Sequence, residues 1–412
     1  MHILIIHQAF ASFDEPGGTR HYEFARWLAA RGHKVSIIAS PVSYITGERY
    51  SAPAEVAAAP ENHAAVRILR ATVYSAHHKS FVHRVVAFVT FMWSSFWMGM
   101  GIKDVDLVWG TSPPIFQGVT AWLLARLKGA KFLFEIRDLW PQFAIAAGVL
   151  TNRWLILASE WLERFLLRHS DCVVVNSPGF VQHARSRGAP RIEVVANGAD
   201  PTMFEPSADG MDFRRAHGLI GKFVVLYAGA HGWSNDLRVV LEAARVLQES
   251  SVQMVLVGDG KDKPALQSAA ATLDLRNVSF VASVPKREMP GVLAAADACL
   301  AILRPLEEYK TTYPNKVFDY MAAGRPVLLA MDGVFREVVE SARCGIFVSP
   351  GDSAALADAV RTLAADRPLA RTMGANGRTY LEQLFSRDAI ASRLLEVLEA
   401  TVAGRLRDDQ GD

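Results

Sequence analysis

Short apolar segments alternate with amphipathic helical segments along most of this chain, and this alternation limits the fold more than any other feature. The first unit is an apolar segment at His2–His7, a helical segment at residues 20–31 and an apolar segment at Val35–Ala39. This order is typical of a βαβ unit with parallel strands, so its repetition predicts an α/β fold. Further strands are expected at residues 66–69, 106–110, 131–136, 171–176, 192–195, 223–228, 253–257, 278–281, 298–303, 327–330 and 347–348.

The chain is too long for one ordinary core, because it has 412 residues and single cores stop growing at about 250–300 residues. A cluster of turn-forming residues, Asn197–Asp200, follows one of the strands, and the alternation restarts at Phe223. We therefore predict one Rossmann-like domain at residues 1–200, a second at residues 201–385, and a C-terminal helix with a charged tail at residues 386–412.

Composition argues against several classes of protein. The three cysteines, Cys172, Cys299 and Cys344, lack the spacing of a disulfide framework or a zinc site, which favours a reducing cytoplasm. The N-terminal segment lacks the basic region and cleavage site of a signal peptide, so we interpret it as a strand. No basic run with interleaved aromatic residues indicates nucleic-acid binding.

Two features bear on membranes. Residues 1–200 carry 20 Lys and Arg against 15 Asp and Glu, whereas residues 201–412 carry 24 against 27. A basic N-terminal half favours binding to an anionic membrane surface or an anionic substrate. An imbalance of a few charges without functional meaning is an equally weighted alternative. The segment Val85–Ile102 has no charged residue and as a helix would extend about 27 Å. It is interpretable as a transmembrane span, as a buried domain helix, or as a domain helix whose aromatic residues touch a membrane. We favour the last.

The segment from Lys310 to Val327 has the pattern of a helix that begins beside a ligand. Pro314 is tolerated at the start of a helix and Asn315 is a common N-cap, so the helix is expected to begin at Lys316. Its free N–H groups and the charge of Lys316 form a potential anion site. Asp319 lies about one turn away on the same face, within reach of a ribose diol. The alternative is an ordinary salt bridge between Lys316 and Asp319 on a solvated helix.

Two loops that contain glycine follow predicted strands. Gly17 and Gly18 precede the first helix, and Gly229 and Gly232, with His231 between them, follow the first strand of the second domain. Glycine lets the backbone approach a phosphate or a sugar closely, although an ordinary tight loop would have a similar sequence. Neither loop has the GxGxxG pattern of a dinucleotide dehydrogenase.

Charged residues also follow the strand at residues 131–136. Arg137 and Asp138 stand at its carboxyl end, where open α/β sheets bind ligands. We interpret them as site residues, with a buried structural ion pair as the alternative.

Together these motifs resemble the GT-B glycosyltransferases, and more narrowly the retaining, metal-independent sugar transferases grouped as family four. The branch that includes N-acetylfucosamine transferases of surface-polysaccharide pathways is the most similar. The resemblance covers nearly the whole chain and implies two Rossmann-like domains facing across a cleft, an acceptor domain followed by a donor domain, with the last helix crossing back to the first domain. The motifs that carry it are Gly17-Gly18, Thr111–Pro114, Arg137–Pro141, Asn197–Asp200, Val257–Gly260 and Pro314–Val327.

The resemblance also implies roles for single residues. The family has two glutamates eight residues apart; the ribose-binding one corresponds to Asp319, but the one that contacts the donor sugar corresponds to Thr311, which is not acidic. The loop at residues 228–236 lacks the Arg and Lys that the family often places on the diphosphate, so Lys316 is expected to supply that charge. The family's His-Asp pair corresponds to Arg137-Asp138.

The implied reaction moves a sugar from a UDP-sugar to an acceptor hydroxyl with retention of configuration and without a cofactor or metal. The sugar is expected to be an N-acetylated hexosamine or deoxyhexosamine, and the acceptor a lipid-linked saccharide at the inner membrane surface of the cytoplasm. The leaving phosphate itself would accept the acceptor's proton, with Asp138 as a second candidate base. The loop near Val284 would hold the nucleotide base.

Two other functions stay open. A GT-B UDP-sugar 2-epimerase would use acid/base residues, for which His7, His77, His78 and His231 are available. A non-catalytic nucleotide-binding scaffold subunit is compatible with the missing acid at Thr311.

Overall fold

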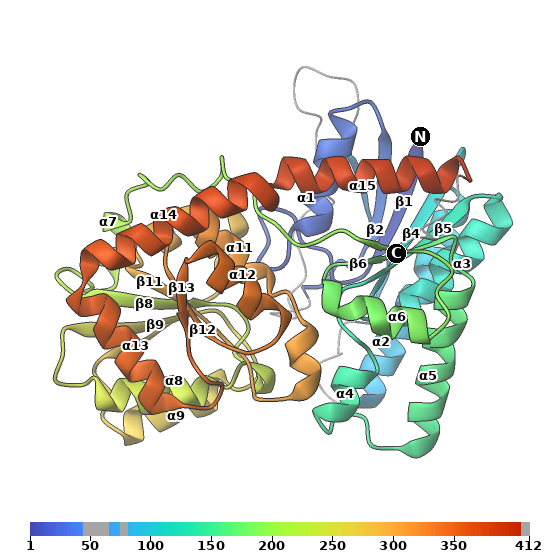
Figure 1. The fold of residues 1–412 in the computed structure, drawn as a ribbon. Helices are drawn as coiled ribbons and strands as arrows, with labels where there is room; N and C mark the ends of the chain where they lie inside the picture. The colour runs from blue at the N-terminus through green and yellow to red at the C-terminus, as the bar shows by residue number, and fades with distance from the viewer. Residues whose placement is uncertain (44–65, 75–80, 405–412) are drawn as a thin grey trace. The chain divides into compact units, whose positions relative to one another are not determined.

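The computed structural model describes residues 1–43, 66–74 and 81–404. The charged tail at residues 405–412 and two of the candidate acid/base residues, His77 and His78, lie outside these residues. The chain forms two compact units, each built on a parallel sheet (Figure 1). The N-terminal unit comprises Met1–Ser12, Gly18–Ala196 and Asp388–Asp412, and the C-terminal unit comprises Phe13–Gly17 and Asn197–Arg387.

The described residues of the N-terminal unit form a seven-stranded sheet in the order β3-β2-β1-β4-β5-β6-β7. All its neighbouring strands are parallel. The strand bounds are β1 (His2–His7), β2 (Lys34–Ala39), β3 (Val66–Arg70), β4 (Leu107–Ser112), β5 (Lys131–Ile136), β6 (Cys172–Val175) and β7 (Ile192–Val194).

Helices pack on both faces of this sheet because its central strands are apolar on both sides. Its helices are α1 (Arg20–Ala29), α2 (Phe81–Met100), α3 (Phe116–Lys128), α4 (Gln142–Ala146), α5 (Arg153–Arg168), α6 (Val181–Ser186) and most of α15 (Arg387–Val402). One core joins Leu4 and Val108 of the strands to Phe91 of α2, Leu124 of α3 and Leu166 of α5, so these three helices cover one face. On α15, Asp388 accepts hydrogen bonds from Trp27 of α1 and from Arg31, which follows α1.

The C-terminal unit contains a six-stranded parallel sheet in the order β10-β9-β8-β11-β12-β13. The strand bounds are β8 (Phe223–Ala228), β9 (Val252–Val257), β10 (Val278–Val281), β11 (Ala298–Ile302), β12 (Val327–Ala330) and β13 (Gly345–Phe347). The helix bounds are α7 (Met211–Ala216), α8 (Leu237–Val246), α9 (Lys263–Thr272), α10 (Met289–Ala294), α11 (Asn315–Ala322), α12 (Val334–Ala342), α13 (Ser353–Ala365) and α14 (Arg367–Leu384).

Alternate residues of β8 face two different cores, as the period of a strand requires. Val224 and Leu226 pack with α11 and α12 on one face, and Val225 and Tyr227 pack with α8 and α13 on the other. The predicted α/β class with two Rossmann-like domains is confirmed.

The start of α11 corrects one prediction. The helix begins at Asn315, one residue earlier than expected, and Pro314 occupies the N-cap position with φ −73° and ψ 120°. Asn315 therefore lies inside the first turn, and its Oδ1 atom is buried without a hydrogen-bond partner among the described residues. Three of the described helices, α4, α7 and α12, were not predicted. Helices α4 and α7 have only five and six residues, too few to show a helical period.

Candidate functional site

The first cluster of predicted site residues lies at the carboxyl end of β8 in the C-terminal unit. Tyr320 holds α11 there, because the N–H of Ala228 donates to its hydroxyl at 3.0 Å and the hydroxyl donates to the carbonyl of Ala228 at 3.3 Å. The ammonium of Lys316, one turn earlier, lies 4.0 Å from the centre of the Tyr227 ring and 3.5 Å from Oδ1 of Asn235. The strand end, the following loop and the helix start thus meet at one cation.

Gly229 leaves room for this cation. A Cβ atom at residue 229 would lie 2.7 Å from Nζ of Lys316 and 3.1 Å from the Tyr227 hydroxyl, and the backbone there has φ +152°. Both the space and the conformation therefore favour glycine.

Lys316 has a cation–π contact and an amide contact but, within the described ranges, no carboxylate partner. Burial lowers the pKa of Lys316 to about 7, because the ammonium loses its hydration and gains no opposite charge. A cation in this state is stabilised when an anion binds beside it, and perturbed groups of this kind cluster at functional sites.

Asp319 is the second residue that α11 brings to this region. Its Oδ2 accepts a hydrogen bond from Nζ of Lys286 at 2.6 Å, and both side chains are mostly buried. The ammonium of Lys286 also lies 5.0 Å from the ring of Phe204. The ion pair that the structure shows for Asp319 is therefore with Lys286, which the sequence analysis missed. The sequence signal that could have identified Lys286 is its position two residues after Val284, in the loop that we expected to hold the nucleotide base.

The side chain of His231 is fully buried, and its ring lies 6.0 Å from that of Tyr227 and 6.2 Å from that of Phe280. Burial lowers its pKa to about 4, so the ring is neutral at pH 7. Its backbone N–H donates to the carbonyl of Asp259 at 2.9 Å, and its own carbonyl lies 2.3 Å from where a Cβ of residue 260 would be. The loop after β9 thus supports the loop after β8.

Glycines at the remaining loop positions border open space. A Cβ atom at Gly18 or Gly232 would meet nothing within 4 Å. Gly17 and Gly18 stand where the chain passes from the C-terminal unit to the N-terminal unit.

In the N-terminal unit, Arg137 and Asp138 follow β5 directly. The guanidinium of Arg137 donates to the carbonyl of Pro113 at 2.8 Å, and its backbone N–H donates to the carbonyl of Ser112 at 3.0 Å. Its Nε is buried without a hydrogen-bond partner among the described residues. Burial raises the pKa of Asp138 to about 6 against the opposing effect of Arg137, so Asp138 can exchange a proton near neutral pH.

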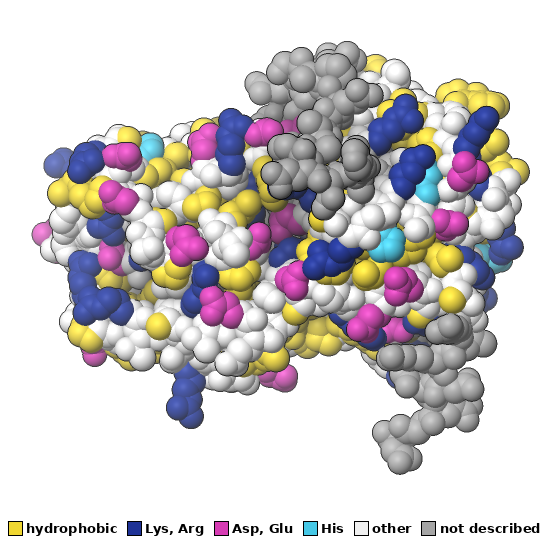
Figure 2. Space-filling view, turned by 90° about the horizontal axis from the view of Figure 1, so that it is seen from above, with side chains coloured by type: hydrophobic (Ala, Val, Ile, Leu, Met, Phe, Trp, Pro, Cys, Tyr) yellow, Lys and Arg dark blue, Asp and Glu magenta, His cyan; other side chains and the backbone are white. Residues whose placement is uncertain are grey.

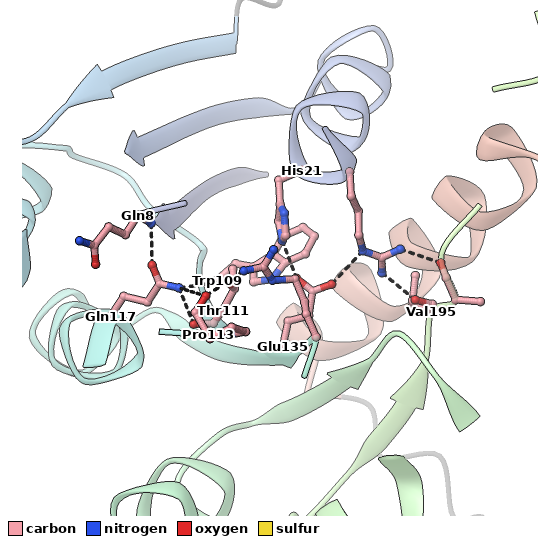
Figure 3. A network of polar contacts seen from close by, with 11 residues as sticks. Gln8, His21, Trp109, Thr111, Pro113, Gln117, Glu135 and Val195 are labelled. Atoms are coloured by element: carbon pink, nitrogen blue, oxygen red, sulfur yellow. Dashed lines mark hydrogen bonds and ion pairs between the residues drawn. The ribbon is translucent and has the colours of Figure 1, made fainter. Parts of the chain in front are cut away.

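One buried polar network at the same strand was not predicted (Figure 3). Glu135, inside β5, accepts from Nε of Arg20 at 3.0 Å, from Nε2 of His21 at 2.5 Å and from Nε1 of Trp109 at 3.2 Å. Arg20 also donates to the carbonyls of Val195 and Ala196, each at 2.6 Å. The network ties the first turn of α1 to β4, β5 and the segment after β7. The sequence feature that could have indicated this network is a glutamate, Glu135, inside an otherwise apolar strand.

The charges of this network are balanced. Burial alone would raise the pKa of Glu135, but His21 and Arg20 together hold it well below its usual range. Burial lowers the pKa values of His21 and His7, and the two rings lie 4.3 Å apart. A carboxylate that accepts from three donors has little capacity left for a ligand.

Two family models match the chain. The glycosyl transferase 4-like domain matches residues 17–198, and the model described as Glycosyl transferases group 1 matches residues 222–366. One relative is WcaI of Escherichia coli (strain K12), named as a colanic acid biosynthesis glycosyl transferase. It is 27% identical over 316 residues, which cover 73% of this chain and 76% of WcaI.

Solved structures resemble the whole chain. Sucrose-phosphate synthase from Thermosynechococcus elongatus has a TM-score of 0.78 at 20% identity and covers 98% of this chain and 100% of its own. HepE of Anabaena, solved in complex with UDP and glucose, has a TM-score of 0.72 at 17% identity and covers 97% and 100%. Identities this low establish the fold alone.

The two parallel sheets, the likeness to these structures and the domain matches define a glycosyltransferase with a GT-B fold.

Proposed function

We propose that the protein is a retaining, metal-independent glycosyltransferase that moves a sugar from a UDP-sugar to an acceptor hydroxyl. The observation that carries the proposal is the buried ammonium of Lys316 on α11, which lies 4.0 Å from the centre of the Tyr227 ring beside the end of β8 and whose pKa burial lowers to about 7. In glycosyl transfer, negative charge grows on the leaving diphosphate, and a fixed positive charge beside it lowers the barrier.

Each part of the donor has a proposed partner. The backbone N–H groups of Asn315 and Lys316, which follow Pro314 at the start of α11, face the diphosphate together with the ammonium of Lys316. The loop from Gly229 to Gly232 approaches it from β8. Asp319 accepts from the ribose hydroxyls, with Lys286 holding its carboxylate in place. Gly17 and Gly18, in the loop before α1, are the further residues proposed to approach the phosphates.

Proton transfer is assigned to the leaving phosphate, which removes the need for a strong protein base. Asp138 is the second candidate, because its pKa of about 6 allows it to be ionised at pH 7. Arg137 is proposed to contact phosphate or the donor sugar through the Nε that has no partner among the described residues.

The sugar and acceptor follow from the resemblance to the N-acetylfucosamine-transferase branch. We propose an N-acetylated hexosamine or deoxyhexosamine as the sugar, and a lipid-linked saccharide at the cytoplasmic membrane face as the acceptor. The name of WcaI, with its reference to colanic acid biosynthesis, supports a role in surface-polysaccharide assembly. None of the helices among the described residues is long and apolar enough to cross a bilayer.

The 2-epimerase reading has less support. Two of its candidate acid/base residues, His7 and His231, are fully buried and held neutral at pH 7 by burial. Thr311 stands where the family has the glutamate that contacts the donor sugar. Its hydroxyl donates a hydrogen bond to the carbonyl of Glu308 at 2.6 Å.

A panel of UDP-sugars in EDTA tests the proposal, with released UDP and the product's anomeric configuration as readouts. We expect one N-acetylated sugar to give UDP and a product of retained configuration. Dependence on an added divalent metal, or inversion at the anomeric carbon, would overturn the mechanism.

A further inference from the structure

Four tryptophans of the N-terminal unit are largely exposed. Trp93 and Trp97 on α2 are 67% and 58% exposed, and Trp154 and Trp161 on α5 are 76% and 64% exposed. Tryptophan has one of the largest apolar surfaces of any side chain, and exposed apolar clusters mark contact surfaces.

The exposed residues form one stripe on each helix. On α2, Val86, Trp93 and Met100 are exposed and seven residues apart, which places them on one side of the helix. On α5, Trp154 and Trp161 have the same spacing. These stripes face away from the core that the opposite sides of the helices form with the sheet.

Helix α3 joins the two stripes, because it packs against α2 and α5. The rings of Phe88 and Phe116 lie 5.5 Å apart between α2 and α3, and those of Trp122 and Phe165 lie 4.8 Å apart between α3 and α5. We call this outer surface the tryptophan face; its exposed apolar residues are Val86, Val89, Trp93, Trp97, Met100, Leu123, Leu127, Trp154, Leu155, Leu157 and Trp161.

The exposed charge on helices α3 and α5 is predominantly positive. Helices α2 and α3 contain no acidic residue, and the two in α5, Glu160 and Glu163, form ion pairs with Arg187. Glu163 is also paired with His183 and is buried. The exposed charged residues of α3 and α5 are Arg126, Arg153, Arg164 and Arg168. By contrast, acidic and basic side chains are interspersed on the face shown in Figure 2.

A polar pocket of about 420 Å³ lies at the C-terminal ends of α3 and α5. Its lining includes Arg126, Arg168 and His169, together with Lys131, which is paired with Asp171 at 2.9 Å. Two arginines at helix C-termini are placed to contact an anionic headgroup.

We propose that the tryptophan face docks the enzyme on a bilayer that contains anionic phospholipid. Tryptophan rings suit the boundary between headgroups and acyl chains, and arginines beside them bind phosphate. A second copy of this chain is a poorer occupant, because a symmetric contact through this face would bring like charges together. The inference deepens the proposed function and rests on it for its purpose, because a lipid-linked acceptor lies at the bilayer.

The direction of the helices suits such an acceptor. Helices that connect parallel strands run opposite to them, so α2, α3 and α5 begin at the carboxyl edge of the sheet. Arg137 and Asp138 lie at that same edge. A bilayer on the tryptophan face would therefore adjoin the edge at which an acceptor hydroxyl is proposed to react.

Vesicle flotation of the full chain tests the proposal. Wild type should float with vesicles of phosphatidylcholine and phosphatidylglycerol, and much less with phosphatidylcholine alone. The double variant Trp154→Gln/Trp161→Gln should lose at least tenfold in partitioning, and Arg126→Glu/Arg164→Glu should lose the preference for anionic vesicles. The matched controls Ile220→Gln/Val246→Gln and Arg238→Glu/Arg371→Glu change exposed residues of the C-terminal unit and should float as wild type does.

UDP binding by calorimetry on the same samples separates this inference from the proposed function. Retained UDP binding in the tryptophan variant shows that it is folded, so its loss of flotation supports docking. Wild type that binds UDP but ignores anionic vesicles would overturn the docking surface and leave sugar transfer intact. A wild-type dimer that the tryptophan substitutions dissociate, without any flotation, would instead assign this face to self-association and overturn the proposal.

Discussion

Two buried charges, one in each unit, have opposite surroundings. In the N-terminal unit, the carboxylate of Glu135 accepts hydrogen bonds from Arg20, His21 and Trp109. In the C-terminal unit, the ammonium of Lys316 has an aromatic ring and an amide beside it but no carboxylate among the described residues. The first charge is compensated within the fold, and the second is compensated only when an anion binds.

The difference separates a structural role from a binding role. A buried charge with its partners in place holds segments together, whereas a buried charge without them costs folding free energy and persists where a ligand uses it. We therefore expect Glu135 to govern stability and Lys316 to govern affinity for the donor.

The largest expected effect is on stability. Glu135→Gln removes the negative charge that Arg20 and His21 share, and breaking a buried pair in this way costs about 3–5 kcal/mol of unfolding free energy. Urea denaturation measures the loss. The control Glu396→Gln breaks an exposed pair with Arg393, which should cost less than about 1 kcal/mol. A Glu135 variant as stable as this control would refute the structural assignment.

The next effect is on affinity. Lys316→Met should weaken UDP binding about 10- to 100-fold, the equivalent of one charged hydrogen bond, while unfolding free energy stays equal or rises because a poorly compensated buried cation is removed. Lys310→Met changes a lysine that is paired with Glu307 on the surface and should leave affinity unchanged. Equal affinities in the two variants would mean that Lys316 does not face the diphosphate.

The smallest effect is on pH dependence. Because the pKa of Lys316 is lowered to about 7, its charge is present below that pH and is lost as pH rises through it. UDP affinity should therefore fall between pH 7 and pH 9, by at most about tenfold per unit. Arginine stays protonated over this range, so Lys316→Arg should flatten the profile. A wild-type profile as flat as that of the arginine variant would contradict the assignment.

The fold was largely predictable, because parallel strands buried on both faces appear as continuous apolar runs. β1, β5, β8 and β12 have the expected bounds. The start of α11 was not predictable to the residue, because both Pro314 and Asn315 suit the position before a helix.

The site was predictable only where chemistry is local in sequence. Lys316 and Asp319 share one helix, so their spacing was visible. The partner of Asp319, Lys286, is 33 residues away, and Arg20 is 115 residues from Glu135. Only the folded sheet brings such residues together.

Calorimetric titration with UDP in EDTA, on wild type and on Asp319→Ala, tests the central claim most directly. Wild type should bind without metal, and the variant should lose about 1.5–3 kcal/mol of binding free energy, the value of a hydrogen bond to a charged group. Asp358→Ala, at an exposed carboxylate of the same unit, should bind as wild type does. Wild type that ignores UDP, or an Asp319 variant that matches the Asp358 control, would contradict the donor site proposed here.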